Sequence, residues 1–388
     1  MPASTLRAGT PTGRAGLLLA VAGTAAVLWG AAGVEDPALV PLLAVTLAIG
    51  ALFVAFDFGF TSGFRALVAG GDGRALAASC IVPAAAALVI IPVAAGIDGF
   101  GRFVAPIGPS LVVGAAMFGV GMQLAGGCGS GVLVALGQGS RRSWVALPFF
   151  CLGGVAGSLA LPWAMTLPGL APIDLVDRFG PWGGLLATEA LLLATALLLL
   201  RGARPPRDRL VAGLILGTVA AAIFLASGHP WGITMGFTLW GAKAVEAIGF
   251  DLGWSPFWAD PGMARLLVEP ALLQHASTGN LGVILGALAA AAMLGRLRHG
   301  TPIGRRAAAA AALGGLLMGI GARLAFGCNV GAFIGGVSSG SLHGFVWLAA
   351  AIPGSWVGVR LRRRFGLDGV AARSLGRDAG NRTASARE

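Results

Sequence analysis

Long apolar runs separated by short charged stretches fill most of the chain. Clear examples lie at residues 17–34, 185–200, 210–226 and 281–297. An apolar run of about 20 residues is long enough to cross the hydrocarbon core of a bilayer as an α-helix. The pattern therefore predicts an all-α integral membrane protein, built as a polytopic helical bundle.

The composition supports the same class. Of the 388 residues, 56% are hydrophobic and only 11% are charged. A soluble domain usually has about 25% charged residues. A chain with so few charges cannot cover itself with polar surface, so lipid is expected to be the solvent for most of it.

The net charge of +11 does not indicate a nucleic-acid partner. The arginines lie in short loops between apolar runs rather than on one face of a domain, as a nucleic-acid interface would require. An excess of Lys and Arg instead marks cytoplasmic loops. The loops predicted to be cytoplasmic contain Arg7 and Arg14, Arg65 and Arg74, Arg141 and Arg142, and the stretches 201–209, 296–306 and 360–364. The acidic loops predicted to lie outside contain Glu35 and Asp36, Asp174 and Asp177, and Asp251 and Asp260. Lys243 does not fit this scheme.

The two ends are predicted to lie in the cytoplasm. Residues 1–38 are expected to form a cytoplasmic segment and a first membrane-spanning helix. Arginines before an apolar run also occur in signal peptides, but this run is long and no good small-residue cleavage site follows it. The polar residues 363–388 are expected to form a disordered tail.

An internal repeat divides the chain. Residues 114–131 (GAAMFGVGMQLAGGCGSG) and 314–331 (GGLLMGIGARLAFGCNVG) are identical at eight of eighteen positions. Chance alone predicts about two identities in a chain so rich in Gly, Ala and Leu, so the match indicates a duplication. A second match, between residues 58–64 (FGFTSGF) and 231–237 (WGITMGF), has the same order in each half. The first half is predicted to cover residues 39–163 and the second half residues 210–362, joined by a connecting segment at 164–209.

The two copies are predicted to cross the membrane in opposite directions. Arg141 and Arg142 follow the first Gly-Cys element, whereas Arg305 and Arg306 precede the second. Because arginine-rich loops are cytoplasmic, the first copy ends inside and the second starts there. The fold class is therefore an all-α membrane protein with two inverted-topology repeats, a common plan among transporters.

Each half contains one cysteine within a glycine-lined break. The breaks contain Gly127, Cys128 and Gly129 in the first half, and Gly327, Cys328 and Asn329 in the second. Non-helical backbone is tolerated at membrane depth only where it is buried in protein or lines a polar cavity. Free N–H groups at the start of a short helix form an anion site. These segments are therefore predicted to be re-entrant or broken helices that line a transport path.

The thiols suggest the substrate class. A neutral thiol is a weak and polarisable hydrogen-bond donor, which suits a sulfur-bearing anion that must bind and then leave. The alternative is that small residues merely allow close helix packing, but this does not explain a cysteine in both copies. Cys80 and Cys151 lie in ordinary apolar surroundings, and none of the four cysteines has the spacing of a metal site.

For the polar residues near the breaks, the sequence leaves two possible roles open. Thr61, Ser62 and Thr234 are predicted to line the same path, or else to bond neighbouring carbonyl groups. Gln123 and Arg323 occupy equivalent positions just before the cysteines. An arginine within a membrane segment is by default a functional candidate. The alternative for Arg323 is an ion pair with Glu246 or Glu269.

These motifs resemble the YeeE/YedE sulfur-transport family. The similar stretches are LAGGCGSG at 124–131, GHPWGITMGFTLWGAK at 228–243 and ARLAFGCNVGAF at 322–333. The resemblance implies a multi-pass protein of the bacterial inner membrane with about nine spans and four shorter re-entrant segments. It also implies uptake of thiosulfate, handed on by cysteines that correspond here to Cys128 and Cys328. Family members often have a third cysteine in the first hairpin, but residues 58–65 (FGFTSGFR) contain none, so Thr61 or Ser62 replaces it or the substrate differs.

The sequence thus predicts a transporter of a small sulfur-containing anion, most of all thiosulfate, and not an enzyme. Its partners are the bilayer and the anion, with no cofactor, metal or nucleic acid. Three alternatives remain: a membrane thiol enzyme, a membrane subunit that docks a soluble cytoplasmic sulfur carrier, and a transporter of a selenium compound.

Overall fold

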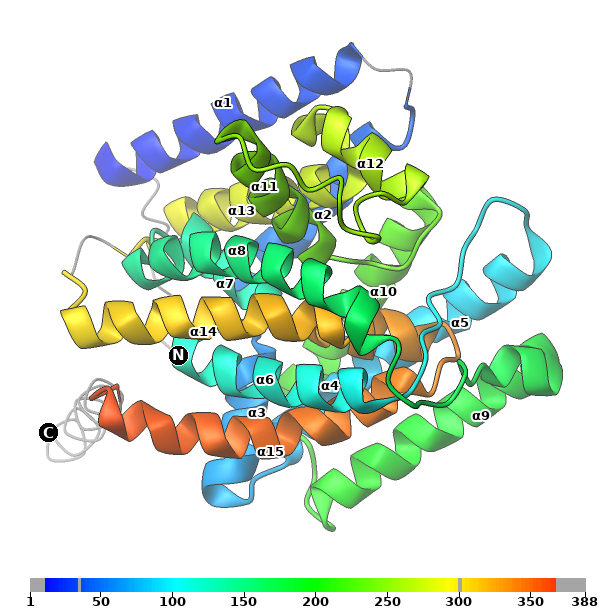
Figure 1. The fold of residues 1–388 in the computed structure, drawn as a ribbon. Helices are drawn as coiled ribbons and strands as arrows, with labels where there is room; N and C mark the ends of the chain where they lie inside the picture. The colour runs from blue at the N-terminus through cyan, green and yellow to red at the C-terminus, as the bar shows by residue number, and fades with distance from the viewer. Residues whose placement is uncertain (1–10, 34–35, 299–301, 368–388) are drawn as a thin grey trace, which may run out of the picture.

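The computed structural model describes residues 11–33, 36–298 and 302–367. Within these ranges the chain is helical, and its extended backbone makes only two isolated bridges, Ile107 with Leu170 and Asp174 with Ser341 (Figure 1). The all-α class is confirmed. The last helix extends to Arg364, so the predicted tail starts too early, and residues 368–388 lie outside the described residues.

Ten segments of the described chain are long and apolar enough to cross a membrane, one more than the resemblance implies. The long helices are α1 (Pro11–Ala32), α2 (Leu39–Ala55), α5 (Ile81–Gly96), α6 (Pro109–Ala125), α8 (Arg141–Ala164), α9 (Leu175–Leu200), α10 (Arg207–Ser227), α13 (His275–Met293), α14 (Arg305–Leu324) and α15 (His343–Arg364). The shorter elements are α3 (Phe60–Gly70), α4 (Arg74–Ser79), α7 (Gly129–Gly137), α11 (Thr234–Ala247), α12 (Pro261–Val268), η1 (Ala271–Leu273) and the π-helix η2 (Asn329–Gly336). The chain is a polytopic membrane protein.

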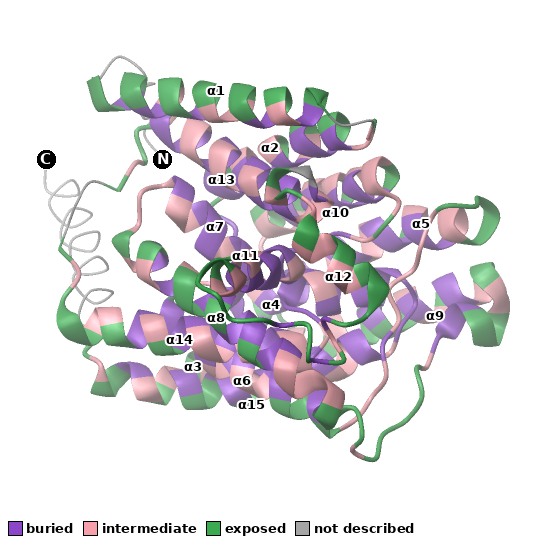
Figure 2. Ribbon diagram, turned by 45° about the horizontal axis from the view of Figure 1, so that its top comes forward, coloured by how far each residue is buried: buried purple, intermediate pink, exposed green. Residues whose placement is uncertain are grey.

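Apolar side chains face outward on the peripheral helices, as lipid requires. Leu18 and Trp29 on α1 and Trp182, Leu186 and Leu198 on α9 are all exposed. Figure 2 shows this contrast, with exposed residues along α1 and α9 and buried ones where α6, α8 and α14 pack together. Because lipid rather than water surrounds these helices, exposing apolar side chains on their outer faces costs no free energy.

The two copies of the Gly-Cys element meet along α6 and α14. A Cβ added to Gly114 would lie 2.8 Å from the carbonyl oxygen of Gly321, and one added to Gly121 would lie 2.6 Å from that of Gly314. Position 114 is equivalent to 314 in the repeat, and position 121 is equivalent to 321. The contact of Gly114 with Gly321 is therefore the repeat equivalent of the contact of Gly121 with Gly314. Early residues of each helix face late residues of the other, which means that α6 and α14 pack antiparallel. The inversion of the complete halves, and their boundaries, stay predictions.

Candidate functional site

The cysteines of the repeat lie where a long helix stops and a short one starts. Cys128 precedes α7, and Cys328 precedes η2. The preceding breaks contain residues with positive φ, at Gly126 (85°), Phe326 (57°) and Gly327 (152°). Cys128 is 2% exposed and Cys328 fully buried. Glycines at the breaks let the backbone turn where a side chain would strain it, so each cysteine starts a new helix within the protein.

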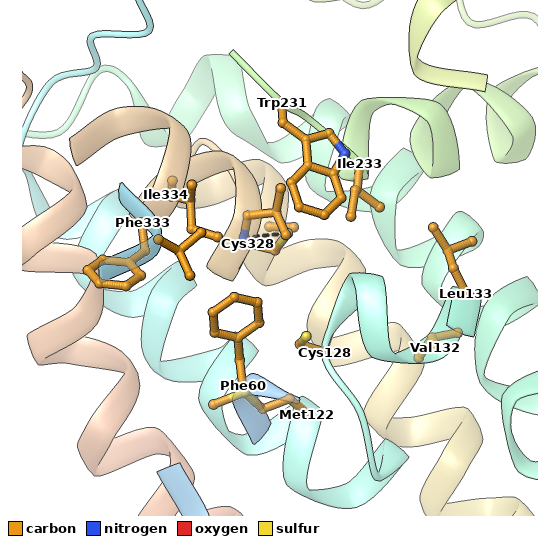
Figure 3. Close-up of a cluster of buried hydrophobic side chains, with 14 of the residues drawn as sticks. Phe60, Met122, Cys128, Val132, Leu133, Trp231, Ile233, Cys328, Phe333 and Ile334 are labelled. Carbon is orange, nitrogen blue, oxygen red and sulfur yellow. Dashed lines mark hydrogen bonds between the residues drawn. The ribbon is translucent and has the colours of Figure 1, made fainter. Parts of the chain in front are cut away.

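The two breaks are adjacent in space. A Cβ added to Gly129, the first residue of α7, would lie 3.4 Å from the Sγ atom of Cys328 and 3.6 Å from a methyl group of Ile233. Figure 3 shows Phe60 and Ile233 beside the two cysteines, within the main buried core of the protein. The structure therefore brings together two thiols that are 200 positions apart in the sequence.

The N-termini of four short helices gather at this cluster. Phe60 is the first residue of α3, and Ile233 immediately precedes α11. Cys128 and Cys328 themselves precede α7 and η2, so four helix N-termini, each carrying the positive end of a helix dipole, lie near the cysteines. In the described residues, α3, α7 and α11 have no side-chain cap, and η2 is capped only by a weak contact from the N–H of Val330 to the Sγ atom of Cys328 (3.4 Å). Such an arrangement favours an anion.

Several buried polar side chains of the described residues have atoms without hydrogen-bond partners, and Thr61 and Asn329 are two of them. The hydroxyl of Thr61 and both amide atoms of Asn329 make no hydrogen bond to the described residues. Thr61 is 6% exposed and Asn329 is fully buried. Leaving a buried polar group unsatisfied costs about 1–3 kcal/mol. Because both residues start short helices next to the cluster, their free atoms suit a polar ligand.

The structure does not place every predicted residue at the cluster. Ser62 is exposed, and its hydroxyl donates to the carbonyl of Gly59 at 2.7 Å, within its own turn. Thr61 and Ser62 are neighbours on a helix and face different directions, which the sequence alone did not resolve. The carbonyl of Gly327 accepts a hydrogen bond from the indole of Trp347 at 3.2 Å, which fixes the second break.

Equivalent side chains in the two halves bind equivalent short helices. Arg323 on α14 donates to the hydroxyl of Thr234 (3.4 Å) and to the sulfur of Met235 (3.1 Å), at the start of α11. Gln123 on α6 donates to the carbonyl of Thr61 at 3.3 Å, at the start of α3. Each half thus fastens one short helix through the residue five positions before its cysteine. The alternative ion pair of Arg323 with a glutamate is wrong.

The family follows from comparison of the whole chain. The family model for sulphur transport matches residues 57–357. The chain belongs to the sulphur transport family. This confirms the resemblance seen in the Gly-Cys motifs.

Named relatives are transporters. The thiosulfate transporter TsuA of Spirochaeta thermophila is 32% identical over 267 residues, which cover 63% of this chain and 75% of that protein. The probable transporter YedE of Escherichia coli is 32% identical over 144 residues, covering 37% of this chain and 35% of that protein. The protein of the same name from Salmonella typhimurium is 32% identical over 155 residues, which are 40% and 37% of the two chains.

Loops on the predicted outer side close over the end of η2. The guanidinium of Arg102 binds the carboxylates of Asp174 (2.5 Å) and Asp177 (2.8 Å), and the N–H of Phe103 donates to the hydroxyl of Ser339 at 3.0 Å. Partial burial lowers the pKa of Arg102, but the two carboxylates outweigh this effect and raise its pKa above the ordinary value. Arg102 therefore stays charged, and its ion pairs hold these loops together at neutral pH.

The cysteines have no activating base in the described part of the chain. The Sγ atom of Cys128 contacts the hydroxyl of Ser130 at 3.3 Å, and that of Cys328 accepts a weak hydrogen bond from the N–H of Val330 at 3.4 Å. His343, the base nearest to Cys328 along the sequence, instead bonds the hydroxyl of Ser341 at 2.7 Å. No group of three or more His, Cys, Asp or Glu side chains able to hold a metal gathers in the described ranges. The arrangement suits binding of an anion better than activation of a nucleophile.

Proposed function

We propose that this protein imports thiosulfate across the bacterial inner membrane, along a path that passes between Cys128 and Cys328. The observation that carries this proposal is the convergence of four short-helix N-termini on two buried thiols. The family and the similarity to a thiosulfate transporter support the same substrate.

The chemistry of the cluster fits a dianion with one soft sulfur end. Uncapped N–H groups of α3, α7 and α11 replace part of the hydration shell of the anion, and the helix dipoles favour its negative charge. The neutral thiols add weak, polarisable contacts to the terminal sulfur. Binding remains weak enough for the anion to leave, which transport requires. Thr61, Thr234 and Asn329 supply the remaining polar contacts.

The alternatives have less support. A membrane sulfurtransferase or redox enzyme needs a base that activates its thiol, and in the described residues the side-chain and backbone hydrogen-bond partners of the two cysteines are Ser130 and Val330. A selenium compound would fit the same soft site. The first hairpin lacks the third cysteine and has Thr61 there, whose hydroxyl is a less polarisable donor than a thiol. A soluble sulfur carrier that docks on the cytoplasmic side would consume the imported sulfur and is compatible with transport.

The proposal predicts thiosulfate-dependent growth. Expression in a bacterial host without its own uptake system should restore growth on thiosulfate as the sole sulfur source. The purified protein in proteoliposomes should carry labelled thiosulfate across the membrane. A docking subunit would instead co-purify with its partner and show no flux, whereas an enzyme would turn over in detergent and form a persulfide on one cysteine.

Arg323 is expected to bring the anion to the cluster from the outer side. It lies at the far end of α14 from the cytoplasmic pair Arg305 and Arg306, and it binds Thr234. The Arg323→Gln variant should raise the half-saturating thiosulfate concentration at the outer face about tenfold, because it loses a charge-assisted contact. Arg265→Gln is the matched control, since Arg265 is exposed and pairs with Glu269. Equal uptake kinetics in both variants would refute this role.

A further inference from the structure

A buried histidine lies at the end of η2 that is opposite to Cys328. The helix η2 starts directly after Cys328 and ends at Gly336. His343, the first residue of α15, is fully buried, and Phe103 of an outer loop contacts its ring edge-on, with 5.3 Å between the ring centroids. A Cβ added to Gly336 would lie 2.7 Å from the Nε2 atom of His343, so the imidazole packs against the last residue of η2. One helix of eight residues therefore connects a thiol of the anion site with an imidazole.

The imidazole can take up a proton without losing its hydrogen bond. Its Nδ1 atom and the hydroxyl of Ser341 are 2.7 Å apart, and a hydroxyl donates to a neutral ring or accepts from a protonated one. The Nε2 atom is buried and makes no hydrogen bond to the described residues. The last carbonyls of η2 accept hydrogen bonds from Ser338, Ser339 and Ser341. The ring is therefore not needed to cap η2 and is free to change its charge.

The charged groups of the outer loops beside His343 do not pair with it. They are Asp98, Arg102, Asp174, Asp177 and Arg178. The backbone of Asp174 pairs with that of Ser341, but its carboxylate binds Arg102 and accepts from the N–H of Val176. Asp98, Asp177 and Arg178 are exposed. None of these groups forms a hydrogen bond or an ion pair with the imidazole.

The helices packed around His343 supply no counter-charge either. The helix η2 packs against α5, α7 and α15, and α15 also packs against α6; the sequences of η2, α5, α6 and α7 contain no Asp, Glu, Lys, Arg or His. The helix α3 contacts α15 too, but its Arg65 binds Gln123, which lies beside Gly358 near the other end of α15. A buried charge without a partner is costly. The imidazole is therefore expected to be neutral as long as no anion is bound.

An anion at the cysteines changes this balance. The dipole of η2 has its positive end at the cysteine site and its negative end at Gly336, beside the imidazole. Eight residues of helix span about 10 Å, and across a protein interior two opposite charges still attract each other at this distance. A dianion at the start of η2 therefore favours protonation of His343. By linkage, the proton raises the affinity for the anion by the same factor.

We propose that His343 binds a proton that enters together with the sulfur-containing dianion, so that import is coupled to protons. This inference rests on the proposed function. A ring nitrogen forms an N–H bond with a proton from the outer solution and releases this proton on the cytoplasmic side after the anion has left the cysteines, with no transfer of electrons. A dianion that enters alone moves two negative charges into a negatively charged interior, whereas one accompanying proton halves the charge that is moved.

The test imposes a pH gradient on proteoliposomes whose membrane potential is clamped at zero with potassium and valinomycin. With the outside one pH unit more acidic, the unaltered protein should accumulate labelled thiosulfate up to about tenfold, because one coupled proton transmits the tenfold proton gradient. A pH-sensitive dye inside should report the entry of protons with the anion. His343→Gln keeps a hydrogen-bonding side chain but takes up no proton, so thiosulfate should equilibrate without accumulating. His229→Gln is the matched control and should accumulate normally, because His229 is exposed and bonds only near its own turn.

Glu189 is the competing proton carrier and provides a second variant. It lies within α9, and its Oε1 atom is buried without a hydrogen-bond partner in the described residues. The helix α9 packs mainly against α4 and α5, away from the four short helices of the site. Glu189→Gln should therefore keep full accumulation. Loss of accumulation in Glu189→Gln would assign the proton to Glu189 and overturn the proposal.

The outcomes separate coupling from import. Gradient-driven accumulation that persists in His343→Gln would overturn the proposal, and so would flux of the unaltered protein that ignores the pH gradient. If His343→Gln does not fold, titration calorimetry in buffers of different ionisation enthalpy counts the protons taken up on binding. About one proton per thiosulfate, kept in Glu189→Gln, would support His343, and none would refute it. No thiosulfate flux from the unaltered protein under any gradient would contradict the proposed function itself.

Discussion

Replacing Cys128 or Cys328 by Ala is expected to lower thiosulfate flux about tenfold or more while the protein still folds. Each change removes a weak contact from the proposed path between the two thiols, and a tenfold loss corresponds to about 1.4 kcal/mol, within the range of a single hydrogen bond. Both thiols are buried next to the start of α7. Serine should restore part of the flux, because its hydroxyl donates but lacks the polarisable sulfur. Flux of labelled thiosulfate into proteoliposomes measures the effect.

The other two cysteines are matched controls for this experiment. Cys80 and Cys151 are also buried, but neither starts a short helix at the cluster. The thiol of Cys80 contacts the carbonyl of Leu76 within its own helix. Ala variants of both should therefore keep flux within about twofold of the unaltered protein. Normal flux in both Cys128→Ala and Cys328→Ala would rule out a path between the thiols.

Gly121→Val is expected to prevent folding altogether. A Cβ at this position would lie 2.6 Å from the carbonyl oxygen of Gly314 and 2.8 Å from the main-chain nitrogen of Met318. Backbone atoms cannot move aside as the end of a side chain can, so α6 and α14 would have to separate. Overpacking of this kind costs about 3 kcal/mol or more, a large part of the typical stability of a domain. Size-exclusion chromatography in mild detergent should show no monodisperse protein.

The matched control is Gly96→Val. A Cβ at Gly96, at the end of α5, would meet no heavy atom of the described structure within 4 Å. This variant should elute like the unaltered protein. If Gly121→Val also gave a monodisperse peak and normal flux, the close contact of the two repeat helices would be wrong.

Much of the site could be predicted from local sequence patterns. The breaks at Cys128 and Cys328 were expected because glycine-rich interruptions of apolar runs are a local signal, and the duplication marked both at once. Four shorter segments were implied by the resemblance to the family, and the structure has α3, α7, α11 and η2 at the site. Thr61 and Ser62 could not be separated, because which of two neighbours points inward depends on the rotation of α3 against its surroundings.

The meeting of Arg65, Arg142 and Arg362 at the end of α6 could not be predicted from the sequence. Arg65, Arg142 and Arg362 occur there only as loop charges that mark the cytoplasmic side. Each reaches the end of α6 from a different helix, so their meeting depends on how α3, α8 and α15 pack. The alternative prediction that Arg323 pairs with a glutamate was wrong for the same reason. A charge near an anion path has several partners within reach, and only the packing of α11 against α14 selects Thr234.

By itself the sequence determined the membrane class, the spanning segments and a repeated Gly-Cys element, because lipid imposes strict rules on hydrophobicity and on backbone hydrogen bonding. Only the tertiary structure decided that Cys128 and Cys328 lie side by side. It also showed that α6 and α14 pack antiparallel through glycines, and that arginines flank the thiols on both sides. The pairing of the two cysteines and that of α6 with α14 depend on contacts between residues about 200 positions apart, and such contacts leave no local pattern to read.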